Sequence, residues 1–113
     1  MHEMSIAQNI VEIVTETLRE HTGAVLQEVG VDIGELVAVV PESLEFCYNV
    51  LIEETPLAGS ELNINILPLM GICKSCNKEV HVENMIFICP HCSSYSIEIY
   101  QGEELNLSYL EVE

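Results

Sequence analysis

Positive charge is the scarcest feature of this sequence. Three of its 113 residues are Lys or Arg (Arg19, Lys74 and Lys78), against nineteen acidic residues, and the formal net charge is −16. A nucleic-acid-binding protein needs Lys and Arg to displace counterions from phosphates, and anionic membrane surfaces also attract basic segments. The sequence therefore excludes nucleic acid and an anionic membrane surface as partners. It favours cationic ligands and basic protein partners.

A long hydrophobic run is also missing. The longest apolar stretch, Ile66–Cys73, has eight residues, whereas a membrane-spanning helix needs about 20. The first residues lack the basic and apolar regions of a secretory signal peptide. With 113 residues and 49% apolar composition, the sequence predicts a compact cytoplasmic protein with one domain, or with one domain and a small satellite.

Two segments have the apolar periodicity of helices. From Ile6 to Leu18 the apolar residues fall on one side of a helical wheel and the polar residues on the other, which predicts an amphipathic helix. A second helix is expected from Pro41 to just before Pro56, because proline at the first helical position loses no hydrogen bond. Its apolar residues leave only a thin polar strip. We therefore expect it to be covered by the sheet and, in addition, by the first helix or another subunit.

Three further segments alternate apolar and polar residues, as half-buried strands do; they are residues 25–33, 61–67 and 104–112. The expected architecture is α+β: a small mixed sheet that pairs these segments, two helices on one face, and a four-cysteine zinc-ribbon lobe inserted before the last strand. Residues 1–69 and 101–113 would form the α+β domain, and residues 70–100 the inserted lobe.

Four of the five cysteines form two Cys-x-x-Cys pairs, Cys73 with Cys76 and Cys89 with Cys92, with twelve residues between the pairs. In a chain without a secretion signal this spacing favours a metal site over disulfides. Four thiolates satisfy the tetrahedral preference of Zn(II) and leave no position for a substrate, so we expect a structural site. Iron is the alternative metal, because it also accepts four sulfurs. A redox dithiol would need one such pair in a βαβ setting, which is absent.

A short hairpin is expected to join the two cysteine pairs, with Val80, Val82, Ile86 and Ile88 in its strands. Such a lobe has little apolar core, so metal binding would supply much of its folding energy. The fifth cysteine, Cys47, falls on the apolar face of the second helix and is expected in the core.

The first three residues carry a second metal-binding pattern. The amine of Met1 and the amide and imidazole nitrogens of His2 can close two adjoining chelate rings around one ion, and Glu3 can supply an oxygen. Nitrogen ligation in a plane suits Ni(II) or Cu(II), although a terminal histidine is otherwise a solvated side chain. His81 and His91 lie near the cysteines. They are expected at the surface, with substitute metal ligation as the alternative.

Four features combine along the chain: Met1–Glu3 at the start, the run Met4–Ala7, the segment Pro41–Cys47 and the late pair of Cys-x-x-Cys motifs. Together they resemble the HypA family of nickel metallochaperones over essentially the whole chain. The resemblance implies a carrier, not an enzyme, that delivers Ni(II) during maturation of [NiFe]-hydrogenase. Its implied partners are a HypB-type GTPase and the hydrogenase large subunit. Some relatives also serve urease, a question that the sequence leaves open.

The resemblance also implies which residues bind each metal. It maps the transported Ni(II) onto Met1, His2 and Glu3, and it makes residues 1–69 and 101–113 the nickel-binding domain. It maps the structural Zn(II) of the 70–100 lobe onto the four paired cysteines: Cys73, Cys76, Cys89 and Cys92.

Two other function classes compete with this interpretation. The chain would be a zinc-ribbon adaptor if its lobe docked a protein and its N-terminus bound no nickel. An enzyme, either a redox dithiol or a zinc hydrolase, is disfavoured because a site with four thiolates is closed and no nucleophile–base set is apparent. The sequence leaves open whether the protein is a monomer or a homodimer.

Overall fold

The computed structural model describes residues 3–113, which divide into two compact units. The first unit holds the residues up to 32, residues 39–65 and residues 106–113, and the second holds residues 33–38 and 66–105. No helix within residues 3–113 is long and apolar enough to cross a membrane. In chain order the elements are α1 (Glu3–Leu18), β1 (Leu26–Gly34), the 3₁₀ helix η1 (Glu35–Val37), α2 (Pro41–Ile52), β2 (Glu61–Leu67), β3 (Met70–Cys73), β4 (Glu79–His81), β5 (Ile97–Gln101) and β6 (Leu105–Val112).

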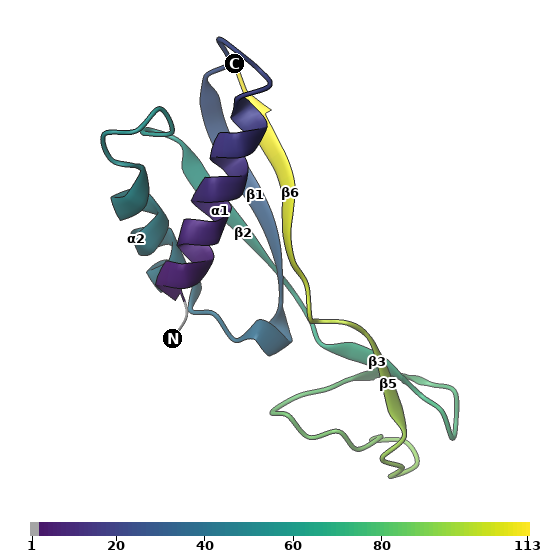
Figure 1. Ribbon diagram of the computed structural model, residues 1–113. Coiled ribbons are helices and arrows are strands. Elements are labelled where there is room, and N and C mark those ends of the chain that lie inside the picture. The colour runs from purple at the N-terminus through teal and green to yellow at the C-terminus, as the bar shows by residue number, and fades with distance from the viewer. Residues whose placement is uncertain (1–2) are drawn as a thin grey trace. The chain divides into compact units, whose positions relative to one another are not determined.

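Strands β2, β1 and β6 form a three-stranded sheet in that order. Val25 and Glu113 exchange two backbone hydrogen bonds, of 3.4 and 2.9 Å, which is the pattern of an antiparallel pair of strands. β6 therefore runs against β1, whereas β2 runs in the same direction as β1 (Figure 1). The sheet is mixed, and both α1 and α2 lie on one of its faces. This arrangement confirms the predicted α+β fold.

The core of the first unit lies between the helices and this sheet face. Its buried residues repeat every three or four positions along the helices and alternate along the strand, because each element turns one side inward. Tyr48 is the largest of them, and its hydroxyl lies 2.7 Å from the hydroxyl of Ser60, which satisfies its polar end. The buried residues from the two helices and β1 include Ile6, Ala7, Ile10, Val14, Val29, Val31, Leu44, Tyr48 and Ile52.

Helix α2 is less covered than its apolar composition predicted. Leu44, Tyr48 and Ile52 are buried and define one face of the helix. Phe46, which is 68% exposed, and Val50, which is 44% exposed, lie on the opposite side. Within the described chain, α2 is therefore covered along one face only. Coverage by another subunit stays a prediction.

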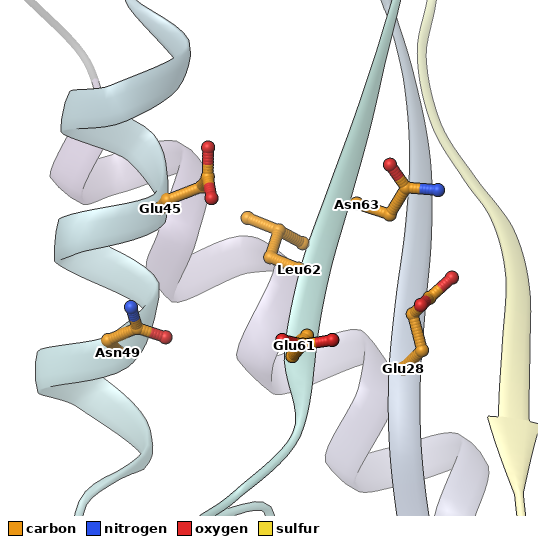
Figure 2. A pocket seen from close by; sticks show the side chains of 6 residues that line it. All are labelled: Glu28, Glu45, Asn49, Glu61, Leu62 and Asn63. Carbon is orange, nitrogen blue, oxygen red and sulfur yellow. The ribbon is translucent and has the colours of Figure 1, made fainter.

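A hollow of about 390 Å³ lies where α2 passes the outer edge of β2 (Figure 2). β2 is an edge strand of its sheet, so alternate backbone N–H and C=O groups along that edge have no strand partner within residues 3–113. The lining residues come from three elements: Glu28 of β1, Glu45 and Asn49 of α2, and Glu61, Leu62 and Asn63 of β2.

The second unit contains the antiparallel sheet β4-β3-β5 and a small buried core. The predicted hairpin between the two cysteine pairs is wrong. β4 pairs with β3, Met70 opposite His81, and residues 86 and 88 lie outside the strands. Asn84 and Met85 both have positive φ angles, of 54° and 60°. The backbone therefore turns sharply at this point, and extended pairing cannot continue.

Candidate metal centre

The four paired cysteines gather their sulfur atoms at one point of the second unit. All four sulfurs lie within 4.8 Å of one another. The Sγ atoms of Cys73 and Cys92 are 3.6 Å apart, and those of Cys76 and Cys89 are 3.7 Å apart. Sulfurs bound at about 2.3 Å to a tetrahedral zinc ion would be ~3.8 Å apart. The arrangement therefore fits one tetrahedrally bound metal ion with four thiolate ligands.

Two segments with the same backbone conformation present these sulfurs; we call residues 73–78 the first knuckle and residues 89–94 the second knuckle. In each, the N–H of the first cysteine donates to the carbonyl five residues later, and its carbonyl accepts from the N–H four residues later. Asn77 and Ser93, the residues that supply the latter N–H groups, have φ angles of 61° and 64°. This left-handed conformation turns the chain so that both cysteines of a knuckle face the same point. The donor–acceptor distances of these backbone hydrogen bonds are 2.7–2.9 Å: Cys73 bonds to Lys78 and Asn77, and Cys89 bonds to Ser94 and Ser93.

The two knuckles are also joined to each other. The hydroxyls of Ser75 and Ser94 lie 2.9 Å apart. The backbone N–H of Lys74 donates to the carbonyl of Ser96, just beyond the second knuckle, at 2.8 Å. These bonds set the separation of the two cysteine pairs. The exposed ion pair between Lys74 and Glu98, at 3.6 Å, adds little because water screens it.

Without a metal, ionisation of one cysteine in this cluster opposes ionisation of another. The backbone N–H of Cys76 holds the pKa of Cys73 at about 6, against the opposing effect of burial. Cys92 accepts a hydrogen bond from the N–H of Ser94, which lowers its pKa. The neighbouring thiols, Cys73 first among them, outweigh that effect and raise the pKa of Cys92 to about 12. A thiolate at one cysteine thus disfavours a second. A divalent cation would remove this conflict, since it stabilises all four thiolates together.

Comparison with known proteins identifies the family. The profile described as "Hydrogenase/urease nickel incorporation, metallochaperone, hypA" matches residues 1–112. The chain belongs to the HypA family. It is 41% identical over 113 residues to the hydrogenase maturation factor HypA of Geobacter metallireducens, with 100% of both chains covered. It is 40% identical to that of Trichodesmium erythraeum, with 100% of this chain and 96% of the relative covered.

Two solution structures share the HypA fold with this chain at 24% sequence identity. The Ni metallochaperone HypA from Helicobacter pylori matches with a TM-score of 0.67 over 99% of this chain and 97% of that one. A second HypA protein matches with a TM-score of 0.70 over 99% and 96% of the two chains. The family membership confirms the resemblance found in the sequence. As a HypA protein, the chain is a metallochaperone for nickel incorporation into hydrogenase or urease, not a catalytic enzyme.

The structure describes only part of the nickel site predicted from the sequence. Met1 and His2 lie outside the described residues. Glu3 opens α1 and is buried, and its Oε2 accepts a hydrogen bond of 2.9 Å from the backbone N–H of Val40. This bond connects the first residue of α1 to the residue that precedes α2. Glu3 therefore has a structural contact in addition to its predicted role toward nickel.

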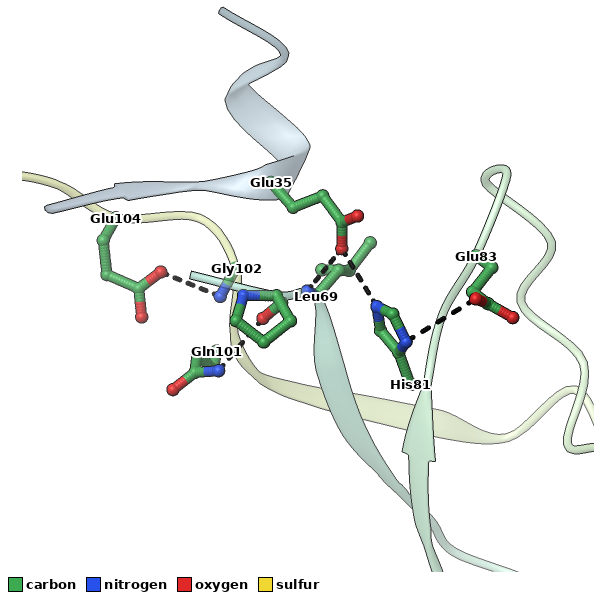
Figure 3. A network of polar contacts seen from close by, with 8 residues as sticks. Glu35, Leu69, His81, Glu83, Gln101, Gly102 and Glu104 are labelled. Carbon is green, nitrogen blue, oxygen red and sulfur yellow. Dashed lines mark hydrogen bonds and ion pairs between the residues drawn. The ribbon is translucent and has the colours of Figure 1, made fainter. Parts of the chain in front are cut away.

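The second unit also contains a polar network that sequence reasoning missed (Figure 3). Nε2 of His81 lies 3.2 Å from Oε1 of Glu35, and Nδ1 of His81 lies 3.8 Å from Glu83. Oε1 of Glu35 also accepts the backbone N–H of Leu69 at 2.8 Å. That bond, followed by the one to His81, lowers the pKa of Glu35. His81 and His91 are both exposed, as expected.

Proposed function

We propose that this chain binds Ni(II) through the amine of Met1, the amide and imidazole nitrogens of His2, and Glu3, and that it delivers the ion during maturation of [NiFe]-hydrogenase. The observation that carries the proposal is the HypA family match over residues 1–112, which includes this tripeptide. Ni(II) prefers planar nitrogen ligation. A carrier that uses few ligands at a chain end can also release its ion without unfolding. Delivery to urease is the alternative that the family description leaves open.

We further propose that Cys73, Cys76, Cys89 and Cys92 hold one structural Zn(II). The sulfur spacing and the donor set support this assignment. Four thiolates saturate the ion, so it would stabilise the fold and would have no open position for chemistry. On this proposal, residues 70–100 form the zinc-binding lobe, and residues 1–69 and 101–113 the nickel-binding domain.

The proposed partners are a HypB-type GTPase and the [NiFe]-hydrogenase large subunit, because a metallochaperone must hand its cargo to other proteins. The net charge of −16 supports attraction of metal cations and of basic protein surfaces. The cytoplasmic location and the state as monomer or homodimer stay predictions.

The nickel site is tested by titrating untagged, zinc-loaded protein with Ni(II), comparing wild type with His2→Ala. The visible absorption bands of planar Ni(II) report the geometry, and calorimetry reports the affinity. Removing the imidazole should weaken nickel binding by more than about a hundredfold, because losing a ligand costs more than losing its outer-shell partner. His21→Ala is the matched control, since His21 is exposed beyond the end of α1; it should bind nickel like wild type.

Two further measurements sharpen this test. A form with residues added before Met1 should lose tight nickel binding while its zinc content stays near one ion per chain. Nickel affinity should fall as the pH drops below about 6.5, because the imidazole must be unprotonated to bind. Full nickel affinity in the extended form, or in His2→Ala, would contradict the proposed site.

A further inference from the structure

The free edge of β2 has the features of a second interaction site. We propose that the groove between α2 and the edge of β2 receives an extended, positively charged segment of a partner protein, which adds to the sheet β2-β1-β6 as a fourth strand. This inference goes beyond nickel delivery and does not rest on it, because neither Glu3 nor any of the four paired cysteines, the proposed metal ligands among residues 3–113, lines the groove.

The backbone of β2 supplies the first part of the argument. β2 is seven residues long, stands at the edge of its sheet and contains no proline. Its outward N–H and C=O groups can pair with an added strand, and in such complexes main-chain hydrogen bonds supply affinity. The hollow of about 390 Å³ gives room at this edge. Figure 2 shows α2 on the side of β2 that faces away from β1, where it forms the second wall.

The charge of the groove determines its occupant. Each of the three lining elements contributes one carboxylate: Glu28 from β1, Glu45 from α2 and Glu61 from β2. Among the residues that the structure describes, the remaining polar lining consists of the side-chain amides of Asn49 and Asn63, and none of these lining residues is basic. Lysine or arginine on an incoming strand would meet opposite charge, whereas an acidic segment, including a second copy of this acidic chain, would be repelled.

Tyr109 of β6 holds two of the side chains that line the groove. Its hydroxyl donates a hydrogen bond to Glu28 and accepts one of 2.7 Å from Nδ2 of Asn63. Gly30 makes room for the ring, since a Cβ added at Gly30 would lie 2.0 Å from a ring carbon of Tyr109. Two lining side chains are therefore held in place before a partner arrives, which lowers the entropy lost on binding.

The outer surface of α2 adds an apolar component. Phe46 and Val50 are exposed and directly follow the lining residues Glu45 and Asn49 in the sequence. Successive helical residues are about 100° apart around the axis, so this apolar stripe adjoins the polar stripe formed by Glu45 and Asn49. The occupant that fits both stripes combines basic and apolar residues, and a strand presents these on alternate sides.

The backbone part of the proposal is tested with a fluorescent eight-residue peptide of alternating lysine and valine, bound to the full-length, zinc-loaded protein. The same peptide with alternate backbone nitrogens methylated is the control, because it has the same charge but cannot pair along one edge. Anisotropy should show binding at least about tenfold weaker for the methylated peptide, as expected when several hydrogen bonds are lost. The backbone amides of β2 should exchange more slowly in the complex with the unmodified peptide.

The charge part is tested with two pairs of substitutions of equal charge change. Glu45→Gln with Glu61→Gln should weaken peptide binding about tenfold. Glu12→Gln with Glu20→Gln, at exposed positions on α1 and just after it, should weaken it less than twofold. His2→Ala should leave peptide binding unchanged, so failure here is distinct from failure of the nickel proposal. Equal weakening in both pairs, or equal binding of the methylated peptide, would overturn the proposal, since either shows attraction to the overall charge alone.

Discussion

The two units of this chain are stabilised by different means. The first unit buries aliphatic and aromatic side chains from two helices and a sheet. The buried core of the second unit consists of Leu69, Cys73, Val80, Val82 and Cys89, so two of its five residues belong to the cysteine cluster. Apolar periodicity extends along every helix and strand of the first unit, whereas the second unit has a small apolar core, and small cores commonly need a metal or another cross-link to fold. We therefore expect the second unit to depend on the ion proposed for its four cysteines.

The largest difference in stability between the two units is expected when the proposed metal ligands are removed. Cys73→Ser, or treatment of wild type with a chelator, is expected to unfold the second unit and leave the first folded. A structural zinc ion contributes about 10–16 kcal/mol of apparent binding free energy, more than the stability of most domains. Amide NMR spectra should lose the dispersed signals of residues 66–105 and keep those of α1 and β1.

The control for this prediction is Cys47→Ser, which changes a half-buried cysteine of α2 outside the cluster. It should keep the zinc content and both sets of signals. Dispersed signals from residues 66–105 in metal-free protein would show that the second unit does not depend on a metal.

A cavity created by substitution in the core of the first unit should have an intermediate effect on stability. Leu44 is fully buried, so Leu44→Ala should lower the free energy of unfolding by about 2–5 kcal/mol. Helical circular dichroism in urea measures this loss, because both α-helices lie in the first unit. Phe46→Ala, on the exposed side of the same helix, should change stability by less than about 0.5 kcal/mol. If Leu44→Ala also shifted zinc release in urea by the same amount, the two units would unfold as one.

The smallest effect on stability is expected from the substitution Glu35→Gln in the second unit. The N–H of Leu69, followed by His81, lowers the pKa of Glu35 below its ordinary value of 4.5. A lowered pKa in the folded state stabilises the fold above the unfolded-state pKa, and this stabilisation is lost as the pH falls through the folded-state value. The urea midpoint of wild type should therefore exceed that of Glu35→Gln by a small amount at pH 7, and this advantage should not shrink at pH 5.5.

Glu83→Gln tests which contact of His81 matters. Glu83 is near His81 at 3.8 Å, and the hydrogen bond of Leu69 goes to Glu35 instead. The urea midpoint of Glu83→Gln should lie closer to that of wild type than the midpoint of Glu35→Gln does. A wild-type advantage over Glu35→Gln that already shrinks between pH 7 and pH 5.5 would contradict the lowered pKa.

Local patterns in the sequence predicted most of the first unit and the cysteine cluster. The helices and the three strands of its sheet repeat apolar residues over seven or more positions, which is long enough for periodicity to be informative. The cysteine spacing predicted the cluster because each knuckle is a local turn whose shape depends on six consecutive residues. In both cases the pattern that allowed the prediction lies within one short stretch of sequence.

The rest of the second unit could not be predicted in this way. β3 and β4 have four and three residues, too few for a periodic signal, and the apolar run at Ile86–Ile88 looked like a strand although a turn at Asn84 and Met85 precedes it. The hydrogen bonds of Glu35 reach across 34 residues to Leu69 and 46 residues to His81. No local motif marks such contacts, so they became visible only in the structure.

The matching knuckles have a consequence for how quickly a bound ion is exchanged. Because each knuckle has its own backbone hydrogen bonds, a chelator would be able to displace the two sulfurs of one knuckle while the other knuckle still held the proposed ion. The loss rate should then increase with chelator concentration, instead of levelling off at the speed of global unfolding. The proposed ion would then be bound tightly at equilibrium and would still exchange readily with a chelator.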